Sequence, residues 1–154
     1  MKTGFDLLTV PGLLRNAARI YPNKTAAIDA ERGRSVTFAQ LNERTIRLAN
    51  ALRGLGVKKG DKVSYMSYDS LECVEIMYAV NRIGAIWVPQ NYRFNSAELV
   101  RQMEHCDAEI FFVDERCIAT CQAALPELKK LAAGRLVAMG CEVVPEGFLD
   151  FEAL

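Results

Sequence analysis

Apolar residues along most of the chain follow two spacings, one typical of buried strands and one typical of helices. Short apolar runs bounded by turn residues predict four strands. They are Lys62–Ser67, Ala85–Val88, Glu109–Val113 and Arg135–Met139. Apolar residues at helical spacing fill the stretches between them. Because strands and helices alternate, we expect an α/β fold with three α/β/α layers and a mainly parallel sheet of about four to five strands.

Capping residues indicate where the helices between these strands begin and end. Thr37 and Gln40 have the spacing of a capping box, and Asn95 stands just before another helical pattern. Asp69 is expected to cap a helix that ends at Gly84, a residue suited to a left-handed C-terminal cap. The buried side of that helix is expected to consist of Leu71, Val74, Met77, Tyr78 and Ile83.

The two ends of the chain depart from this alternation. The N-terminal end predicts a helix capped by Thr9 and a hairpin of two short strands, Thr25–Ala30 and Arg34–Phe38. Near the C-terminal end, Arg116–Ala133 is expected to be helical with a break at Pro126. We therefore expect a single domain, 1–154, with three parts: 1–36 (N-terminal helix and short β-hairpin), 37–140 (repeated α/β units) and 141–154 (a tail without clear pattern).

Charge and cysteine content narrow the classes of partner and compartment. The 154 residues carry 19 basic and 19 acidic side chains, and this zero balance gives no support for a nucleic-acid partner. It also leaves little electrostatic protection against self-association. No apolar run approaches membrane-spanning length, and the first residues carry charges and a proline too early for a secretory signal. Five cysteines without a C-x-x-C pair are typical of reduced thiols in a cytoplasmic protein.

Several groups that look reactive have a simpler structural interpretation. The glycines of residues 54–60 follow a helix and precede a strand, whereas a dinucleotide-binding fingerprint follows a strand and opens a helix. The neighbours His105–Asp107 point apart at a helix end, so they are better interpreted as a helix terminus. Cys117 and Cys121 would share a helix face, but two thiols and one distant histidine make a weak zinc site. No catalytic and no metal-binding residue is therefore assigned.

The acidic side chains of the helices are expected to cap helix starts and to face solvent. They are Glu72, Glu75, Glu98, Glu104 and Glu127. We expect no catalytic carboxylate pair among them.

The segment NRIGAIWVPQNYR, residues 81–93, places a polar cluster directly after an apolar strand. We expect Ala85–Val88 to be a central strand, buried on both faces, and Pro89 to end its ladder because proline cannot donate to it. Asn91 is expected to hold the turn that follows. In open parallel sheets, ligands collect at the carboxyl ends of the strands. This loop is either the rim of such a site or a simple connection.

In order and spacing, several segments resemble the N-terminal part of the adenylate-forming superfamily, which contains acyl-CoA synthetases, luciferases and peptide-synthetase adenylation domains. The resemblance runs from about Leu8 to Asp114. The segments that carry it are Tyr21–Ile28 (YPNKTAAI), Val36–Leu41 (VTFAQL), Leu48–Val63 (LANALRGLGVKKGDKV) and residues 81–93. Within the superfamily, VPQNYR is most similar to acyl-CoA ligases, long-chain fatty-acid–CoA ligases included.

The resemblance implies a reaction of fatty acid metabolism for a full-length member. A carboxylic acid and ATP–Mg²⁺ give an acyl-adenylate and pyrophosphate, and CoA then displaces AMP. The glycine-rich loop ending in Pro-Lys and the C-terminal lysine that this chemistry needs have no counterpart in residues 1–154. The resemblance thus implies a non-catalytic first subdomain of a longer ligase, with no cofactor bound to it and the remainder of the ligase as its partner.

One site residue is implied by the resemblance. Arg93 occupies the position of an arginine that lies near the CoA nucleotide phosphates in some acyl-CoA ligases, and a guanidinium is suited to bidentate phosphate contact. Gln90 departs from the aliphatic residue that the family often has there. Two alternatives stay open: a free-standing, non-enzymatic α/β interaction module, and a fragment of a peptide-synthetase-type adenylation domain.

Overall fold

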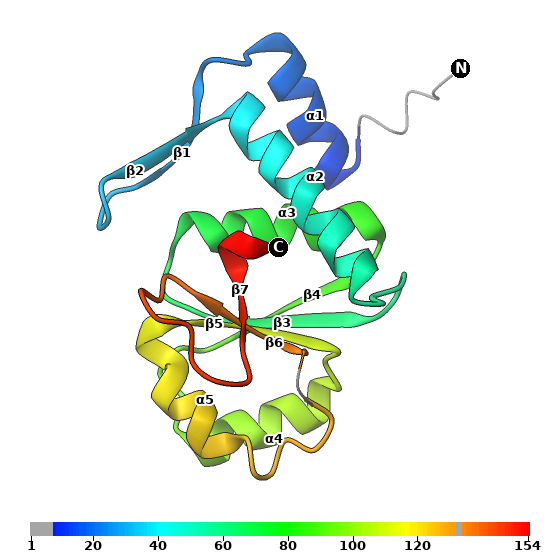
Figure 1. Cartoon of the computed structure of the whole chain (residues 1–154). Helices are drawn as coiled ribbons and strands as arrows, with labels where there is room; N and C mark the ends of the chain where they lie inside the picture. Colours follow the sequence, from blue (N-terminus) through cyan, green and yellow to red (C-terminus); the bar gives the residue numbers. More distant parts are fainter. Residues whose placement is uncertain (1–7, 132–133) are drawn as a thin grey trace.

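A computed structural model describes residues 8–131 and 134–154 of the chain, and it shows a parallel sheet between two layers of helices (Figure 1). The five strands lie in the order β4-β3-β5-β6-β7, and each pairs in parallel with its neighbour. Their bounds are Lys62–Met66 for β3, Ile86–Gln90 for β4, Ile110–Asp114 for β5, Leu136–Met139 for β6 and Leu149–Asp150 for β7. The predicted α/β class and three-layer arrangement are confirmed.

Helices cover both faces of the sheet, and a hairpin stands beside it. In Figure 1, α1, α2 and α3 lie above the sheet, and α4 and α5 lie below it. The helices are α1 (Val10–Ile20), α2 (Phe38–Gly54), α3 (Leu71–Ile83), α4 (Ser96–Cys106) and α5 (Ile118–Ala124), with the short 3-10 turns η2 (Glu115–Cys117) and η3 (Phe151–Ala153). The antiparallel hairpin pairs β1 (Thr25–Asp29) with β2 (Arg34–Thr37). None of the helices in 8–131 and 134–154 is long and apolar enough to cross a membrane.

The central strand β5 divides the core into two halves. Successive side chains of a strand point to opposite faces, so Ile110 and Phe112 pack with α2 and α3, while Phe111 and Val113 pack with α4 and α5. All four side chains are fully buried. Each helical layer therefore forms an apolar core against one face of the same sheet, and β5 contributes side chains to both cores.

Local capping chemistry accounts for most helix boundaries. Thr37 and Gln40 form the predicted capping box of α2, and Asn95 forms a second one with Glu98 at the start of α4. Thr9 accepts a hydrogen bond from the backbone N–H of Gly12 and caps α1. These three predicted caps are confirmed.

The predicted start of α3 is wrong, and its predicted buried side is right only for Leu71 and Ile83. Its N-cap is Ser70 rather than Asp69, and Ser70 makes no side-chain capping hydrogen bond. The buried side holds Glu72, Glu75, Ile76, Ala79 and Val80 together with Leu71 and Ile83, while Val74, Met77 and Tyr78 are only half-buried. Hydrophobic spacing favours the latter side, but arginines from other elements neutralise the two glutamates and allow the helix to turn them inward.

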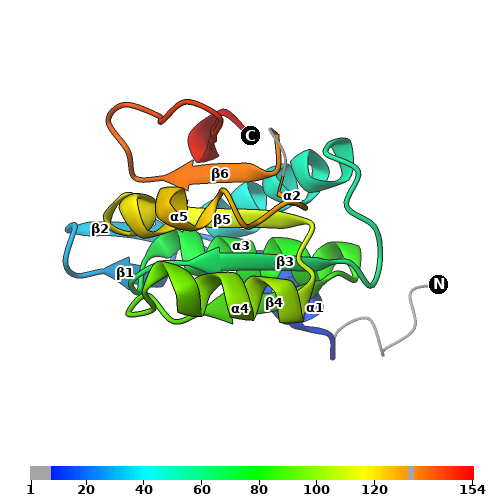
Figure 2. The ribbon, with the colours of Figure 1, turned by 90° about the horizontal axis from the view of Figure 1, so that it is seen from below.

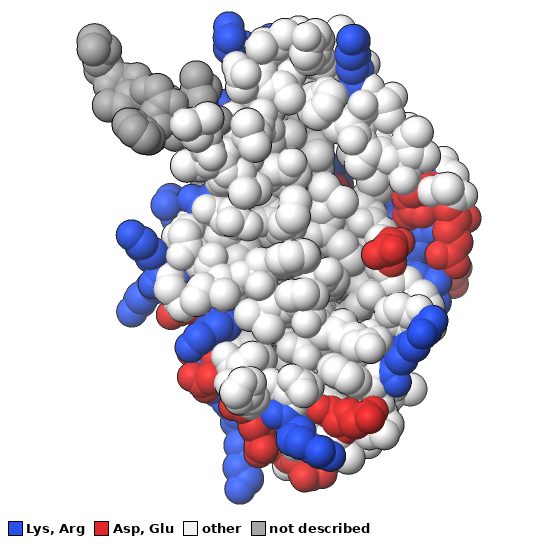
Figure 3. Space-filling view, turned by 180° about the vertical axis from the view of Figure 1, so that it is seen from behind, with Lys and Arg blue, Asp and Glu red and all other residues white. Residues whose placement is uncertain are grey.

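The strand β4 is an edge strand, not the central strand expected from its apolar sequence. Ile86 is 48% exposed, and Pro89 lies within the strand opposite Tyr65 instead of ending it. The backbone N–H of Ile86 donates to the carbonyl of Asp61, on the β3 side. The backbone N–H and C=O groups of every second residue of β4, beginning with Trp87, therefore point away from β3. Pro89 is one of those outward residues, and its missing N–H costs no ladder bond. The back face in Figure 3, where β4 lies, has a broad uncharged middle.

The C-terminal quarter contains a shorter helix and one more strand than expected. α5 ends at Ala124, two residues before Pro126, and turns follow up to Lys130. The last two residues of the predicted helix, 132 and 133, lie outside the described residues. The tail contributes β7 and then η3, whose Phe151 is buried edge-on against Phe112. The tail is therefore part of the domain core.

Candidate functional site

The carboxyl ends of β3, β4 and β5 bring four side chains into one row, which we call the edge row: Arg116, Tyr68, Tyr92 and Arg93. The guanidinium of Arg116 lies 3.9 Å from the ring centroid of Tyr68, and that ring is 4.1 Å from the ring of Tyr92. The guanidinium of Arg93 lies 5.3 Å from the Tyr92 ring. Parallel strands end at the same edge of a sheet, which is where ligands of this fold class bind.

A tight turn after β4 presents Tyr92 and Arg93. The backbone N–H of Phe94 donates to the carbonyl of Asn91 at 3.1 Å, and the N–H of Arg93 donates to the Asn91 side chain at 3.0 Å. The predicted role of Asn91 in holding the turn is confirmed. Arg93 itself is exposed, and within the described part of the chain its guanidinium has no ion pair. It is available to an anion.

Gln90 is an internal residue, which explains why a polar side chain is tolerated at the end of β4. Its side chain is buried and donates to the hydroxyl of Ser64 at 3.0 Å. The Ser64 hydroxyl in turn donates to the carbonyl of Val88. Gln90 thus ties β4 to β3 beneath the loop and does not face the edge row.

Asp114, at the end of β5, anchors the edge row to the rest of the molecule. This carboxylate is 1% exposed and accepts from the Nε of Arg116 at 3.0 Å. Its other oxygen lies 3.1 Å from the hydroxyl of Ser67 and 3.5 Å from a guanidinium nitrogen of Arg32. Arg32 comes from the β1–β2 turn, which Figures 1 and 2 show beside the strand ends. The hairpin and the edge are therefore connected through one buried carboxylate.

Glu72 and Glu75, expected on a solvated face, are 3% and 2% exposed. Glu72 accepts from Arg34 of β2 at 2.8 Å, and Glu75 accepts from Arg44 of α2 at 2.6 Å. Burial would raise the pKa of Glu72, but its hydrogen bonds, that from Arg34 foremost, lower it below its usual value. Burial raises the pKa of Glu75, because the hydrogen bond from Arg44 offsets that effect only in part. These are structural ion pairs between elements.

A groove of about 730 Å³ lies over these ion pairs, between β2, α2, α3 and η3. Arg44 spans it, because the same guanidinium that contacts Glu75 donates twice to Glu152 of η3, at 2.8 and 3.0 Å. The lining charges therefore compensate one another. This groove has an ordinary structural explanation, and it offers a ligand no unpaired cluster of charge.

The other candidates in the sequence are structural in the part of the chain that is described. Gly56 and Gly60 have φ of 87° and 91° in the α2–β3 connection, as a helix cap and turn require. Asp107 is the left-handed C-cap of α4. Cys117 and Cys121 are buried free thiols. No group of three or more metal-binding side chains is found within 8–131 and 134–154.

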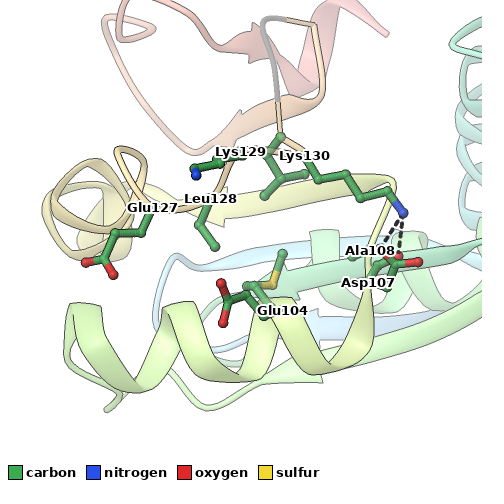
Figure 4. Close-up of a pocket in the computed structure, with 9 residues that line it drawn as sticks. Glu104, Asp107, Ala108, Glu127, Leu128, Lys129 and Lys130 are labelled. Atoms are coloured by element: carbon green, nitrogen blue, oxygen red, sulfur yellow. Dashed lines mark hydrogen bonds and ion pairs between the residues drawn. The ribbon is translucent and has the colours of Figure 1, made fainter.

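A pocket of about 370 Å³ lies between the end of α4 and the turns after α5 (Figure 4). Lys130 reaches across it to Asp107 at 2.6 Å, and Leu128 and Met103 are among the residues that line it. Helices of this fold run opposite to the strands, so the pocket is at the amino-end edge of the sheet. The pocket and the edge row are thus at opposite ends of the strands. Ligands of this fold class bind at the carboxyl ends, so the pocket is the poorer ligand site.

The edge row was only partly predicted. Arg93 was implied by the family resemblance, in a loop that follows a predicted strand, and Tyr68 and Arg116 also follow strands. Applying the rule of strand ends to every strand would have included them. The contact between Arg32 and Asp114 joins residues 82 positions apart and has no such signal.

Comparison with known proteins identifies the family. The chain matches the AMP-binding enzyme family over residues 14–149. It is 34% identical over 148 residues to a 3-oxocholest-4-en-26-oate–CoA ligase of Rhodococcus rhodochrous, covering 95% of this chain and 26% of the relative. It is 35% identical over 133 residues to a feruloyl-CoA synthase of an Amycolatopsis species, covering 86% of this chain and 24% of that protein.

A solved structure agrees with these relatives. The anthranilate CoA ligase AuaEII, in complex with anthranoyl-AMP, has a TM-score of 0.86 to this chain at 28% identity, covering 94% of this chain and 27% of that one. The chain spans about a quarter of the length of the proteins it matches. Since the family match covers most of the chain, this protein belongs to the AMP-binding enzyme family.

Proposed function

We propose that this chain is the N-terminal scaffold subdomain, residues 1–154, of an ATP-dependent acyl-CoA ligase, and that the 154 residues are not catalytic by themselves. In the full-length ligase, a carboxylic acid, ATP with Mg²⁺, and CoA give acyl-CoA, AMP and pyrophosphate. The reducing compartment indicated by the five free cysteines, the cytoplasm, stays a prediction.

The names of the relatives carry this proposal. They describe ligases and synthases that attach 3-oxocholest-4-en-26-oate, ferulate and indoleacetate to CoA, and each is several times longer than the region matched here. Among the described residues, the buried carboxylates of Asp29, Glu72, Glu75 and Asp114 are held in ion pairs between elements, which is the arrangement of a scaffold. The acids in these names differ widely, so they support the reaction class and not one particular acid.

Within this function, we assign Arg93 to the CoA phosphates. The guanidinium is exposed, stands at the carboxyl-end edge of the sheet and has no ion pair within the described residues. These are the properties that a phosphate contact requires, because a planar guanidinium donates two parallel hydrogen bonds to a phosphate. When CoA is bound, its thiol supplies the nucleophile, and the role of Arg93 is to bind and orient the nucleotide end.

Pyrophosphate release tests the ligase assignment directly. The open reading frame that contains these residues is expressed, and pyrophosphate is measured with ATP, Mg²⁺, CoA and a panel of fatty, aryl and steroid acids. We expect CoA-dependent turnover with at least one acid. Adenylation that loads a carrier protein but not CoA would favour a peptide-synthetase-type domain, and no adenylation with any acid would refute the assignment.

The scaffold assignment has its own test on the 154 residues alone. We expect no pyrophosphate release and no ATP binding above that of an unrelated control protein in calorimetry. Micromolar ATP binding by this chain would contradict the proposal that it is non-catalytic by itself.

A further inference from the structure

We propose that Tyr68 and Tyr92 are positioning residues that fix the Arg93 turn against the sheet, so that the guanidinium is held in place before an anion arrives. The ligand role of Arg93 rests on the proposed function, whereas the positioning itself rests on the edge row. Tyr92 is the central element, because its ring lies 4.1 Å from the ring of Tyr68 and 5.3 Å from the guanidinium of Arg93.

Tyr68 is the fixed end of this arrangement. Its carbonyl accepts from the thiol of Cys73 at 3.4 Å and lies 2.6 Å from the hydroxyl of Ser67. Its ring lies 3.9 Å from the guanidinium of Arg116. Both the backbone and the ring of Tyr68 are therefore held by elements other than the β4–α4 loop.

Arg116 is itself held from two directions. It donates to the buried carboxylate of Asp114 at 3.0 Å and to Glu31 of the hairpin turn at 2.9 Å. An arginine with both partners in place loses little further freedom when it covers a ring. The contacts run without a break from the buried Asp114 through Arg116 and Tyr68 to the exposed turn.

Without the rings of Tyr68 and Tyr92, the turn would depend on Asn91 and on Phe94, which packs against the core on the side of α4 and α5. The hydrogen bonds of Asn91 close the turn, but both of them are internal to it. Of the edge-row contacts, the one between the rings of Tyr92 and Tyr68 joins the turn to the segment that follows β3. Holding a long, flexible side chain in its binding position reduces the entropy that it loses on binding. The row therefore preorganises Arg93.

The first experiment measures the turn without any ligand. Amide hydrogen exchange of Arg93 and Phe94 is followed by NMR in the wild-type chain and in Tyr68→Ala and Tyr68→Phe. We expect Tyr68→Ala to speed exchange at these two amides by about three-fold or more, and Tyr68→Phe to leave it as in the wild type, because phenylalanine keeps the contact between the two rings. Unchanged exchange in Tyr68→Ala would overturn the proposal, whatever the ligand.

The second experiment measures binding of adenosine 3′,5′-bisphosphate, the nucleotide end of CoA, to the 154-residue chain by NMR titration. We expect Arg93→Ala to weaken binding about ten-fold or more and the matched surface variant Arg101→Ala to leave it unchanged. Tyr92→Ala and Tyr68→Ala should weaken it by about two- to ten-fold, and the phenylalanine variants should not.

The two proposals fail in different ways. If Arg93→Ala weakens binding and neither tyrosine-to-alanine variant does, the positioning role is wrong and the phosphate contact stands. If Arg93→Ala binds the bisphosphate as the wild type does, the phosphate assignment is wrong, and the exchange experiment alone then decides the positioning role.

Discussion

A guanidinium nitrogen of Arg34 lies 2.8 Å from a carboxylate oxygen of Glu72, and this contact joins the hairpin to the buried side of α3. The same guanidinium contacts Asp29 of β1 at 3.1 Å. Two carboxylates that are 6% and 3% exposed thus share one arginine. Their pKa values are both lowered: for Asp29 mainly by the backbone N–H of Arg32, and for Glu72 by hydrogen bonds, Arg34 foremost, against the effect of burial.

Replacing Glu72→Gln should reduce the free energy of unfolding by about 1–3 kcal/mol at pH 7, because the variant leaves Arg34 with one carboxylate. Because the folded-state pKa of Glu72 is lowered from the usual 4.5, the unfolded chain binds more protons than the folded chain near and below that pH. The stabilisation from the contact between Glu72 and Arg34 is therefore lost as the pH falls through the folded-state pKa. Urea unfolding at pH 7 and pH 3.5 measures it: the variant and the wild type should differ less at pH 3.5. The exposed Glu104→Gln is the matched control, and an equal difference at both pH values would contradict the prediction.

Glu75 should show the opposite dependence on pH. Its pKa is raised by burial, so between the ordinary value of 4.5 and its folded-state value the folded chain keeps a proton that the unfolded chain has lost. The wild type therefore loses stability as the pH rises through this window, whereas Glu75→Gln has no such loss. We expect Glu75→Gln to gain stability relative to the wild type between pH 4 and pH 7 in the same urea experiment. A relative loss over this range, as for Glu72→Gln, would refute the assigned direction.

These two glutamates also show why part of the fold could not be predicted from the sequence. The hydrophobic pattern of α3 gives two candidate sides, and the choice between them depends on Arg34 and Arg44, which lie 38 and 31 residues from their partners. A capping box or a left-handed glycine is a signal within a few residues, and the signals at Thr37, Asn95 and Gly84 were interpreted correctly, although the cap assigned to Asp69 was not. Partners brought together only by the tertiary fold leave no local pattern.

Strand order and the candidate site show the same contrast between local sequence signals and contacts that only the tertiary fold creates. β4 and β5 are both apolar. β4 is the edge strand because it pairs with β3 alone, whereas β5 pairs with both β3 and β6. The position of Pro89 within β4, on the side away from β3, is consistent with an edge strand, and that signal was available in the sequence. Arg93 was implied by the resemblance of residues 81–93, whereas the contact of Tyr92 with Tyr68 depends on the parallel pairing of β3 with β4.

Gly84→Ala should destabilise the domain by about 1–2 kcal/mol. Gly84 is the C-cap of α3 with φ of 73°, where a side chain is strained, and a Cβ there would lie 3.0 Å from the Cγ of Lys59. Gly54→Ala is the matched control, because Gly54 is the last helical residue of α2 and a Cβ there meets nothing within 4 Å. We expect that control to be neutral or stabilising by up to about 1 kcal/mol in thermal unfolding. Equal losses for the two variants would contradict the role of Gly84.

Thiol reactivity should separate the two buried cysteines, Cys117 and Cys121, from the partly exposed Cys141. Burial raises the pKa of Cys121 to about 12 and that of Cys117 to about 11, so neither forms a thiolate at pH 8. We expect these two to react with an aromatic disulfide reagent only after unfolding in denaturant, while the partly exposed Cys141 reacts in the folded chain. Mass spectrometry of the labelled peptides measures each site. Labelling of Cys121 at the rate of Cys141 in the native chain would show that the α5 core opens far more readily than its packing indicates.

The uncharged face around β4 should make the 154-residue chain associate with itself. Ile86 is 48% exposed on the edge strand, the back of the molecule has few charges across its middle (Figure 3), and the chain has no net charge to oppose contact. We expect a sedimentation coefficient that rises with protein concentration. Ile86→Lys should weaken this association by about ten-fold or more, because it places a charge where an apolar side chain would be buried. The matched control is Val143→Lys, at a residue that is 83% exposed in the β6–β7 connection, and it should leave the association unchanged. A wild-type chain that stays monomeric at all concentrations would refute the prediction, and equal effects of both lysines would place the contact elsewhere than at β4.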